Sequence, residues 1–89
     1  MIAVLLRIDG QSVAGALQAA REKLDATEGE LVLDFSSVKR IAPGELNALE
    51  QLADLASDKG IKIALRSVNV HVYKVLKLMK LAAHFSFLA

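Results

Sequence analysis

The fold of this chain is decided by residues 31–65, which read LVLDFSSVKRIAPGELNALEQLADLASDKGIKIAL. The stretch opens with the apolar run Leu31–Phe35, which is typical of a strand and is ended by two serines. Pro43 presets the backbone for a first helical turn, and Gly60 is well placed to stop that helix. Ile61–Leu65 is another short apolar run. The stretch therefore predicts a strand, a helix and a strand.

The helix in this stretch is predicted to be amphipathic, because its apolar residues recur at helical spacing. Glu45 falls in the first turn, where a carboxylate is favourable beside the positive end of the helix dipole. Glu50 and Asp54 fall on the outer side. The inner stripe consists of Leu46, Leu49, Leu52, Ala53 and Ala56.

The residues before this stretch predict one more strand and helix. Ala3–Ile8 is a short apolar run bounded by Asp9-Gly10, which is typical of a strand buried on both faces. Ser12 is placed to cap the helix that follows, and the segment from Thr27 to Gly29 breaks it. The apolar residues of this helix are Val13, Ala16, Leu17, Ala20 and Leu24.

The last third predicts a helix over Val70–Leu81 and a closing strand over His84–Leu88. Strands and helices therefore alternate along the whole chain, starting and ending with a strand. This order predicts the α/β class, with a mostly parallel four-stranded sheet covered by about three helices, because each parallel step needs a crossover longer than a hairpin. A length of 89 residues with 54% hydrophobic residues predicts a single domain over residues 1–89.

Composition excludes several kinds of site. With no cysteine there are no disulfides and no thiolate metal ligands, and the cytoplasm is the expected location. The two histidines, His71 and His84, are thirteen positions apart with no carboxylate near them in the last third, so no metal site is expected. Neither a glycine-rich phosphate loop nor a nucleophile elbow occurs. We expect no cofactor and no enzymatic activity.

Charge is distributed unevenly along the chain. Residues 1–58 carry all 10 acidic side chains and 5 basic ones, whereas residues 59–89 carry 6 basic side chains and no acidic one. The basic residues of the last predicted helix fall at intervals of three, at His71, Lys74, Lys77 and Lys80. This band could touch anionic lipid, but a solvated face is the favoured interpretation. Nucleic acid is not an expected partner, because no aromatic residues interleave with the lysines.

From Glu30 to Leu88 the spacing resembles the STAS family, the bacterial anti-sigma factor antagonist domains that are also appended to sulfate transporters. Val38–Leu46 fits the family's connector and helix start without a gap, and Gly60 falls at the expected glycine. Further apolar positions that follow the family pattern are Leu65, Val68, Val70, Val72, Leu76, Leu78 and Leu81. The resemblance implies the same α/β fold.

The chain departs from the family at the regulatory position. The family's Asp-Ser-Ser-Gly becomes Ala42, Pro43, Gly44 and Glu45, so no hydroxyl remains there to accept a phosphate. The family's phosphorylation switch therefore cannot operate at this position. The chain also starts near what would be the family's second strand, so one edge of the sheet could be bare.

The resemblance implies a non-enzymatic protein interaction module of the anti-sigma factor antagonist type, with an anti-sigma factor or a kinase-type regulator as partner. Its partner-binding residues would be Lys39, Arg40, Ala42, Pro43, Gly44 and Glu45. The alternative is a STAS accessory subunit of a lipid-transporting ABC complex, near a membrane through its partner. Val68–Tyr73, which reads VNVHVY, is similar to that form.

Several of these residues also have simpler interpretations. Glu45 could imitate a phosphate, or it could only complement the helix dipole. Lys39 and Arg40 could pair with acidic partner residues or a nucleotide phosphate, although exposed loop cations usually do neither. Ser36 and Ser37 are alternative hydroxyls for phosphorylation, but serines at strand ends are ordinary turn formers.

Two other expectations concern the surface and the core. A bare sheet edge or the apolar tail Phe85–Leu88 could support a homodimer. Tyr73 is expected in the core.

Overall fold

The computed structural model describes residues 2–88, with side chains from Val4 onward. Within this range four strands alternate with three helices, and two short 3₁₀ turns, η1 (Leu24–Ala26) and η2 (Ala82–His84), lie between them. The bounds are β1 Ile2–Arg7, α1 Val13–Lys23, β2 Gly29–Asp34, α2 Pro43–Asp58, β3 Lys62–Arg66, α3 Val70–Leu78 and β4 Ser86–Leu88. The predicted domain over residues 1–89 also includes Met1 and Ala89, which lie outside the described residues.

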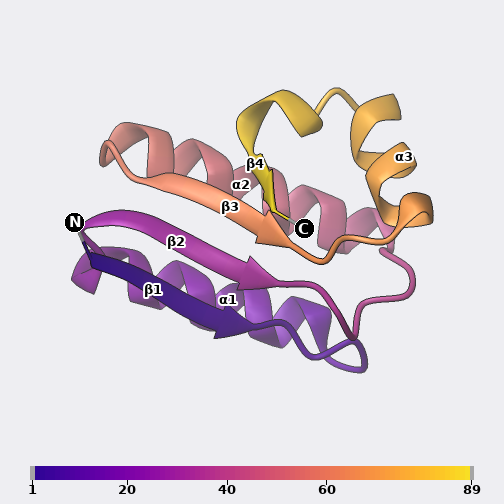
Figure 1. Ribbon diagram of the computed structural model, residues 1–89, viewed down its shortest axis with the longest axis horizontal. Coiled ribbons are helices and arrows are strands. Elements are labelled where there is room, and N and C mark those ends of the chain that lie inside the picture. The colour runs from indigo at the N-terminus through magenta and orange to yellow at the C-terminus, as the bar shows by residue number, and fades with distance from the viewer. Residues whose placement is uncertain (1, 89) are drawn as a thin grey trace.

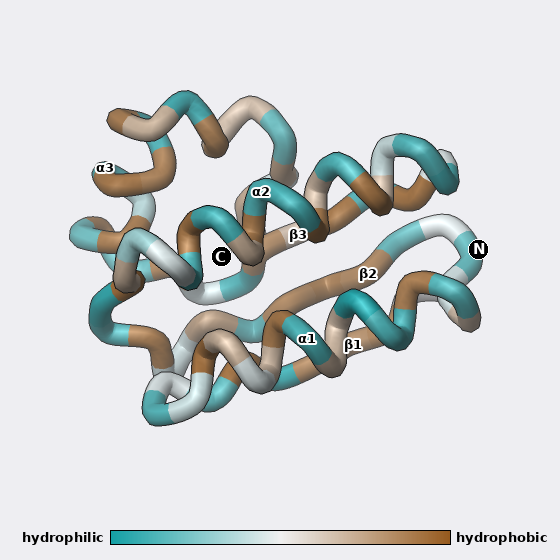
Figure 2. Tube along the Cα trace, turned by 180° about the vertical axis from the view of Figure 1, so that it is seen from behind, coloured by the Kyte–Doolittle hydropathy of each residue, from teal (hydrophilic) through white to brown (hydrophobic). Residues whose placement is uncertain are grey.

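The strands form one parallel sheet in the order β1-β2-β3-β4 (Figure 1). Crossovers between parallel strands are almost always right-handed, so strands that are added in sequence place successive helices on the same face. Figures 1 and 2 show α1 and α2 side by side on one face of the sheet. The α/β class, the parallel four-stranded sheet and the order of its elements are therefore confirmed.

The two faces of the sheet differ in burial. On the helical face, Leu31 and Leu33 of β2 and their register partners in β3, Ile63 and Leu65, are at most 3% exposed. On the other face, exposure rises toward the β1 edge, from 0% at Ala64 and 9% at Val32 to 56% at Leu5. The prediction that the first strand is buried on both faces is therefore wrong. Its position at the sheet edge, with α1 and α2 both on the opposite face, explains the exposure (Figure 1).

Both long helices bury their predicted stripes. The predicted stripe of the first helix is buried except Ala16, which is half-buried, although its last residue, Leu24, lies in η1 and not in α1. The whole stripe of α2 is buried. Ser12 stands at the N-cap of α1, but its side chain makes no capping hydrogen bond. The loop before it is closed by Asp9, whose Oδ1 accepts from the Gln11 N–H at 2.9 Å. The predicted position of the cap is thus right, and its predicted hydrogen bond is wrong.

The end of α2 follows the prediction. Gly60 adopts a left-handed φ of +70°, and the N–H of Ile61 donates to the Ala56 carbonyl at 2.8 Å. This is the Schellman arrangement that glycine favours, because it has no Cβ to clash in the left-handed region.

The end of α3 differs from the prediction. The helix stops at Leu78 instead of continuing to Leu81, because Lys80 adopts a left-handed φ of +61° and the Leu81 N–H bonds back to the Leu76 carbonyl at 2.8 Å. The chain then makes the turn η2, which includes His84, so β4 is shorter than the predicted last strand.

Tyr73 is not a core residue as expected, because its side chain is 39% exposed. Its ring meets that of Phe87 edge to face, with the centroids 5.0 Å apart. Phe87 belongs to β4, the strand at the far edge of the sheet, so this contact covers one side of the tyrosine and leaves the other open. Tyr73 therefore lies at the border between the core and the solvent.

Candidate functional site

The connector between β2 and α2 lies beyond the carboxyl end of the sheet and presents two cations. Val38 is only 2% exposed and Ile41 is partly buried, so both residues anchor the segment to the core. Lys39 and Arg40, between these anchors, are exposed. The predicted positions of the two cations on an exposed connector are therefore confirmed.

Asn69, just before α3, holds the connector from the other side. Its Nδ2 donates to the carbonyl oxygens of Val38 at 3.0 Å and Lys39 at 3.2 Å. Its Oδ1 accepts from the Val72 N–H at 2.8 Å and so caps α3. The sequence analysis missed this residue, although an asparagine directly before a predicted helix is a cap signal.

The start of α2 adjoins the connector and is exposed. Ala42 stands at the N-cap and Pro43 at the first helical position. The exposed residues here are Ala42, Pro43 and Gly44, while Leu46 turns inward and is 8% exposed. The prediction that this segment opens a helix between the second and third strands, with its first residues at the surface, is confirmed.

The carboxylate of Glu45 is engaged within its own helix. Its Oε1 accepts from the Ala42 N–H at 2.7 Å. Alanine has no side-chain oxygen to complete the reciprocal bond of a capping box, so Glu45 supplies the side-chain hydrogen bond that closes this turn. This geometry matches the structural interpretation of Glu45, and the phosphate-mimic hypothesis stays a prediction.

The two serines of the connector have different surroundings. Ser37 is partly buried and its Oγ donates to the Ile8 carbonyl at 3.2 Å, which ties the connector to the loop after β1. Ser36 is exposed, and its N–H donates to Asp34 Oδ1 at 2.9 Å. Of the two alternative phosphorylation positions, Ser36 is the more exposed, and the hydroxyl of Ser37 is engaged in a hydrogen bond.

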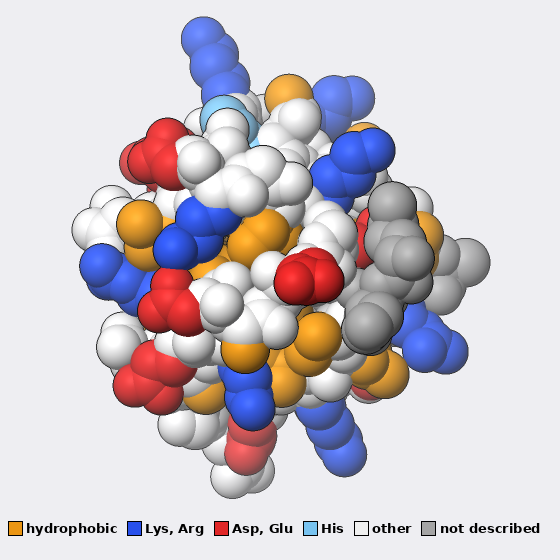
Figure 3. All heavy atoms as spheres, turned by 90° about the vertical axis from the view of Figure 1, so that its left-hand side faces the viewer, with side chains coloured by type: hydrophobic (Ala, Val, Ile, Leu, Met, Phe, Trp, Pro, Cys, Tyr) orange, Lys and Arg blue, Asp and Glu red, His pale blue; other side chains and the backbone are white. Residues whose placement is uncertain are grey.

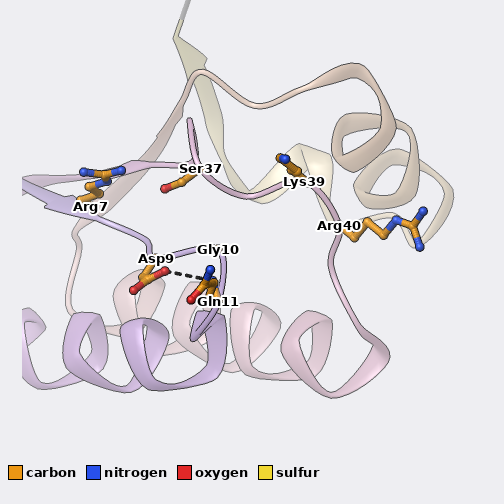
Figure 4. Close-up of a pocket in the computed structure, with 7 residues that line it drawn as sticks. All are labelled: Arg7, Asp9, Gly10, Gln11, Ser37, Lys39 and Arg40. Atoms are coloured by element: carbon orange, nitrogen blue, oxygen red, sulfur yellow. Dashed lines mark hydrogen bonds between the residues drawn. The ribbon is translucent and has the colours of Figure 1, made fainter.

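An open groove of about 760 Å³ separates the connector from the loop after β1 (Figure 4). Its lining residues are Arg7, Asp9, Gly10, Gln11, Ser37, Lys39 and Arg40. Figure 4 shows that Arg40 points away from Arg7 and that Lys39 lies between them, so the three cations do not converge on one point. A phosphate group in this groove would therefore contact one of the three cations at a time. Contact of Lys39 or Arg40 with a nucleotide or an acidic partner stays a prediction.

A smaller groove of about 260 Å³ lies between the start of α2 and the end of α3. Its lining is mostly apolar and consists of Pro43, Leu46, Asn47, Glu50, Met79 and Leu81. Met79 is 55% exposed, so its flexible side chain is available to a partner. The sequence analysis missed this groove because it placed Met79 inside a continuing helix.

The basic band is only partly continuous. His71, Lys74 and Lys77 are exposed on α3, whereas Lys80 lies beyond the helix end. This exposure agrees with the solvated-face interpretation. At the amino ends of the strands, Figure 3 shows acidic and basic side chains intermixed, so no surface of one sign gathers there.

Among residues 2–88 no three His, Cys, Asp or Glu side chains lie close enough together to hold a metal ion. In the same range no helix has both the length and the apolar character that crossing a membrane requires.

Comparisons with known proteins agree on the family. A family model described as the STAS domain matches residues 2–88. The intermembrane phospholipid transport system binding protein MlaB of Escherichia coli K12 is 39% identical over 59 residues, and so is its Shigella flexneri counterpart. Each alignment covers 66% of this chain and 61% of the relative, so this chain spans less than two thirds of the relatives' length.

Solved structures match over nearly the whole chain. A crystal structure of a candidate anti-sigma factor antagonist from Thermotoga maritima has a TM-score of 0.75 at 22% identity, covering 98% of this chain and 73% of that one. An NMR structure of the same protein has a TM-score of 0.75 at 21% identity, covering 96% and 72%. At this identity the likeness shows the fold. The match over residues 2–88 and the parallel sheet with its exposed α2 start show that the chain belongs to the STAS domain family.

Proposed function

We propose that this chain is a non-enzymatic, protein-binding subunit of a membrane phospholipid transport system. The observation that carries the proposal is the 39% identity over 59 residues to MlaB, which is described as the binding protein of such a system. This favours the transport alternative of the sequence analysis over the anti-sigma alternative, because the solved structures that match are too distant in sequence to carry a function.

The proposed docking surface joins the connector to the start of α2. It consists of Lys39, Arg40, Ala42, Pro43, Gly44 and Glu45, together with the apolar groove between α2 and α3. An apolar centre beside exposed charges is the usual composition of a protein interface. The anchors Val38 and Asn69 hold the surface in one conformation, which lowers the entropy lost on binding.

The proposed docking is constitutive. Ala42, Pro43 and Gly44 offer no hydroxyl at the exposed helix start, so a kinase cannot place a charge there. In this proposal the chain lies on the cytoplasmic side of a membrane and is held near it by its partner, as the sequence analysis expects for the transport alternative.

The test is a Gly44→Tyr variant of the tagged protein, purified from its own cells. A Cβ at Gly44 would meet no atom within 4 Å, so a larger side chain fits the isolated fold and projects into the proposed interface. We expect the native protein to copurify with an ATPase and a permease, and the variant to lose them by about tenfold or more.

The control is Ser57→Tyr, which places the same side chain at an exposed position near the other end of α2. This variant should retain the ATPase and the permease. Equal recovery of both proteins with Gly44→Tyr would refute the docking surface, and absence of transport components from the native complex would refute the transport role.

A second candidate is an anti-sigma factor antagonist, and the exposed hydroxyl of Ser36 is the observation that favours it. Phosphorylation of Ser36 would add a charge of about −2 at the border of the docking surface and could restore a switch. The two candidates are distinguished by the copurified partner, which would be a soluble sigma regulator or kinase. After incubation with that kinase and ATP, mass spectrometry should detect phosphate on Ser36 and none on residues 42–46.

A further inference from the structure

Among residues 2–88, β1 has a paired strand on one edge only. It pairs with β2 at every position from Ile2 to Arg7, and within residues 2–88 no strand pairs with its other edge. Sheets usually protect such an edge with proline, a bulge or charged residues. Residues 2–6 include neither proline nor a charged residue, and Arg7 at the end is the one charge of the strand. The edge therefore offers an unprotected row of backbone hydrogen-bonding groups.

The direction of these groups follows from one hydrogen bond. The N–H of Ile8 donates to the Asp34 carbonyl at 2.9 Å, so Ile8 faces β2. Successive residues of a strand direct their N–H and C=O groups to alternate sides. The backbone groups of Ala3, Leu5 and Arg7 therefore point outward from the free edge.

An apolar row on the face of the sheet opposite α1 and α2 ends at this edge. Ala64, Val32 and Leu5 are register partners across β3, β2 and β1, and their exposures rise from 0% to 9% to 56%. The row thus begins at buried apolar residues and ends at Leu5, whose large apolar side chain is exposed to solvent. A further strand at this edge would cover it.

We propose that two copies of this chain pair antiparallel through β1, with the Leu5 residues facing each other on the two-fold axis. In this register Leu5 lies opposite Leu5, and Arg7 lies opposite Ala3 of the second copy. All three residues with outward-pointing backbone groups then form hydrogen-bonded pairs. The register also keeps the helical faces of both copies on the same side, as a continuous sheet requires.

Charge complementarity favours a second copy of this chain as the partner at the β1 edge. The register partner of Ala3 is Glu30, so in the dimer Arg7 of one copy reaches past an alanine to Glu30 of the other. The two Cα atoms would be roughly 10 Å apart, which is two strand spacings and within reach of these two side chains. Within residues 2–88 neither Arg7 nor Glu30 forms an ion pair. Each has an oppositely charged register partner in its own chain, Asp34 beside Arg7 and Lys62 beside Glu30, so the contact between copies would join these pairs into one network of alternating charge.

The helical layer also permits the pairing. One flank of α1 faces α2, where Gln18 and Arg21 line a shared groove with Leu55 of α2. At 100° per residue, the opposite flank carries the small residues Ser12, Ala16 and Ala19 and, at the end of the helix, the exposed and flexible Lys23. These small side chains allow two α1 helices to approach to about 8–10 Å across the axis.

The other homodimer surface, the tail Phe85–Leu88, is less suitable. Phe85 is 8% exposed and Phe87 packs against the core and Tyr73, so these residues are already used within the chain. Leu88 is the one residue of this tail with a largely exposed apolar side chain, at 44%.

The test is the mass of the 89-residue chain by light scattering or sedimentation, over about 1–200 µM, because an interface of one strand pair is small. We expect a species of twice the 9.6 kDa chain mass at the upper end. Leu5→Lys should give only the 9.6 kDa species, since two ammonium groups would face each other on the axis. Leu78→Lys, at a site 80% exposed on α3, is the matched control and should remain dimeric.

A charge exchange tests the register. Arg7→Glu should weaken association by about tenfold, and adding Glu30→Arg to it should restore the native value. Circular dichroism checks that each variant is folded. A 9.6 kDa native chain at every concentration, or a dimer that survives both Leu5→Lys and Arg7→Glu, would overturn the proposal.

Discussion

The Nδ2 atom of Asn69 lies 3.0 Å from the carbonyl oxygen of Val38 and donates a hydrogen bond to it. The same side chain caps α3 through Val72. One residue therefore fixes both the start of the last helix and the connector that presents Lys39 and Arg40. The proposed docking surface depends on this link, because Asn69 holds the carbonyl groups of Val38 and Lys39 and so fixes the backbone that presents the two cations.

Replacing Asn69 with alanine should lower the free energy of unfolding by about 1–3 kcal/mol, because the cap and the donors to the connector are lost together. The measurement is urea denaturation. Asn69→Ser is the matched control, since a serine retains an acceptor for the Val72 N–H but cannot reach the connector. Its loss should be smaller, and equal losses for the two variants would show that the link to Val38 contributes nothing.

Gly10 should tolerate no side chain. A Cβ at this position would lie 1.9 Å from the Ser37 carbonyl oxygen, which is backbone and cannot move aside cheaply. We expect Gly10→Ala to destabilise the protein by about 1–3 kcal/mol or more. Gly44→Ala is the contrasting change, because its site is open, and it should be neutral or stabilising by about 0.5 kcal/mol. Thermal melts of both variants check this, and an unperturbed Gly10→Ala protein would contradict the close approach.

The elements that the sequence predicted well carry strong local signals. Pro43 and Gly60 bound α2 as expected, because each fixes the backbone by its own chemistry. The inner stripe of that helix was likewise predicted completely, since burial follows helical periodicity. The helix start at Ala42–Glu45 followed from the same signals, whereas its role as a partner-binding site came from the resemblance to the STAS family and stays a prediction.

The features that were missed depend on tertiary contacts. No local signal ends α3 at Leu78, because Lys80 is an ordinary helix former that adopts a left-handed conformation here. The exposure of Leu5 depends on which face the helices cover, and periodicity does not report this. The bond from Asn69 to Val38 joins residues that are 31 positions apart, so spacing could not indicate it.

Lys80→Gly should stabilise the protein by about 0.5–1 kcal/mol, because a side chain in the left-handed region clashes with the backbone and glycine removes that strain. Gly60→Ala, at the equivalent position after α2, should destabilise it by about 1 kcal/mol for the opposite reason. Urea denaturation of the two variants provides the comparison. A destabilised Lys80→Gly protein would indicate that the lysine side chain makes a contact worth more than its strain.

Stability should fall at acidic pH partly through Asp34. The Ser36 backbone N–H and then the Ser36 hydroxyl lower the pKa of this carboxyl below its ordinary value of 3.8, with smaller contributions from Arg66 and Arg7. A carboxyl whose pKa is lower in the folded state stabilises the protein at pH above the unfolded value, and this stabilisation is lost as the pH falls through the folded value. Thermal melts should therefore show that Asp34→Asn is less stable than the native chain at neutral pH. The difference should shrink as the pH falls below 3.8, and a difference that persists unchanged in acid would remove Asp34 from the pH response.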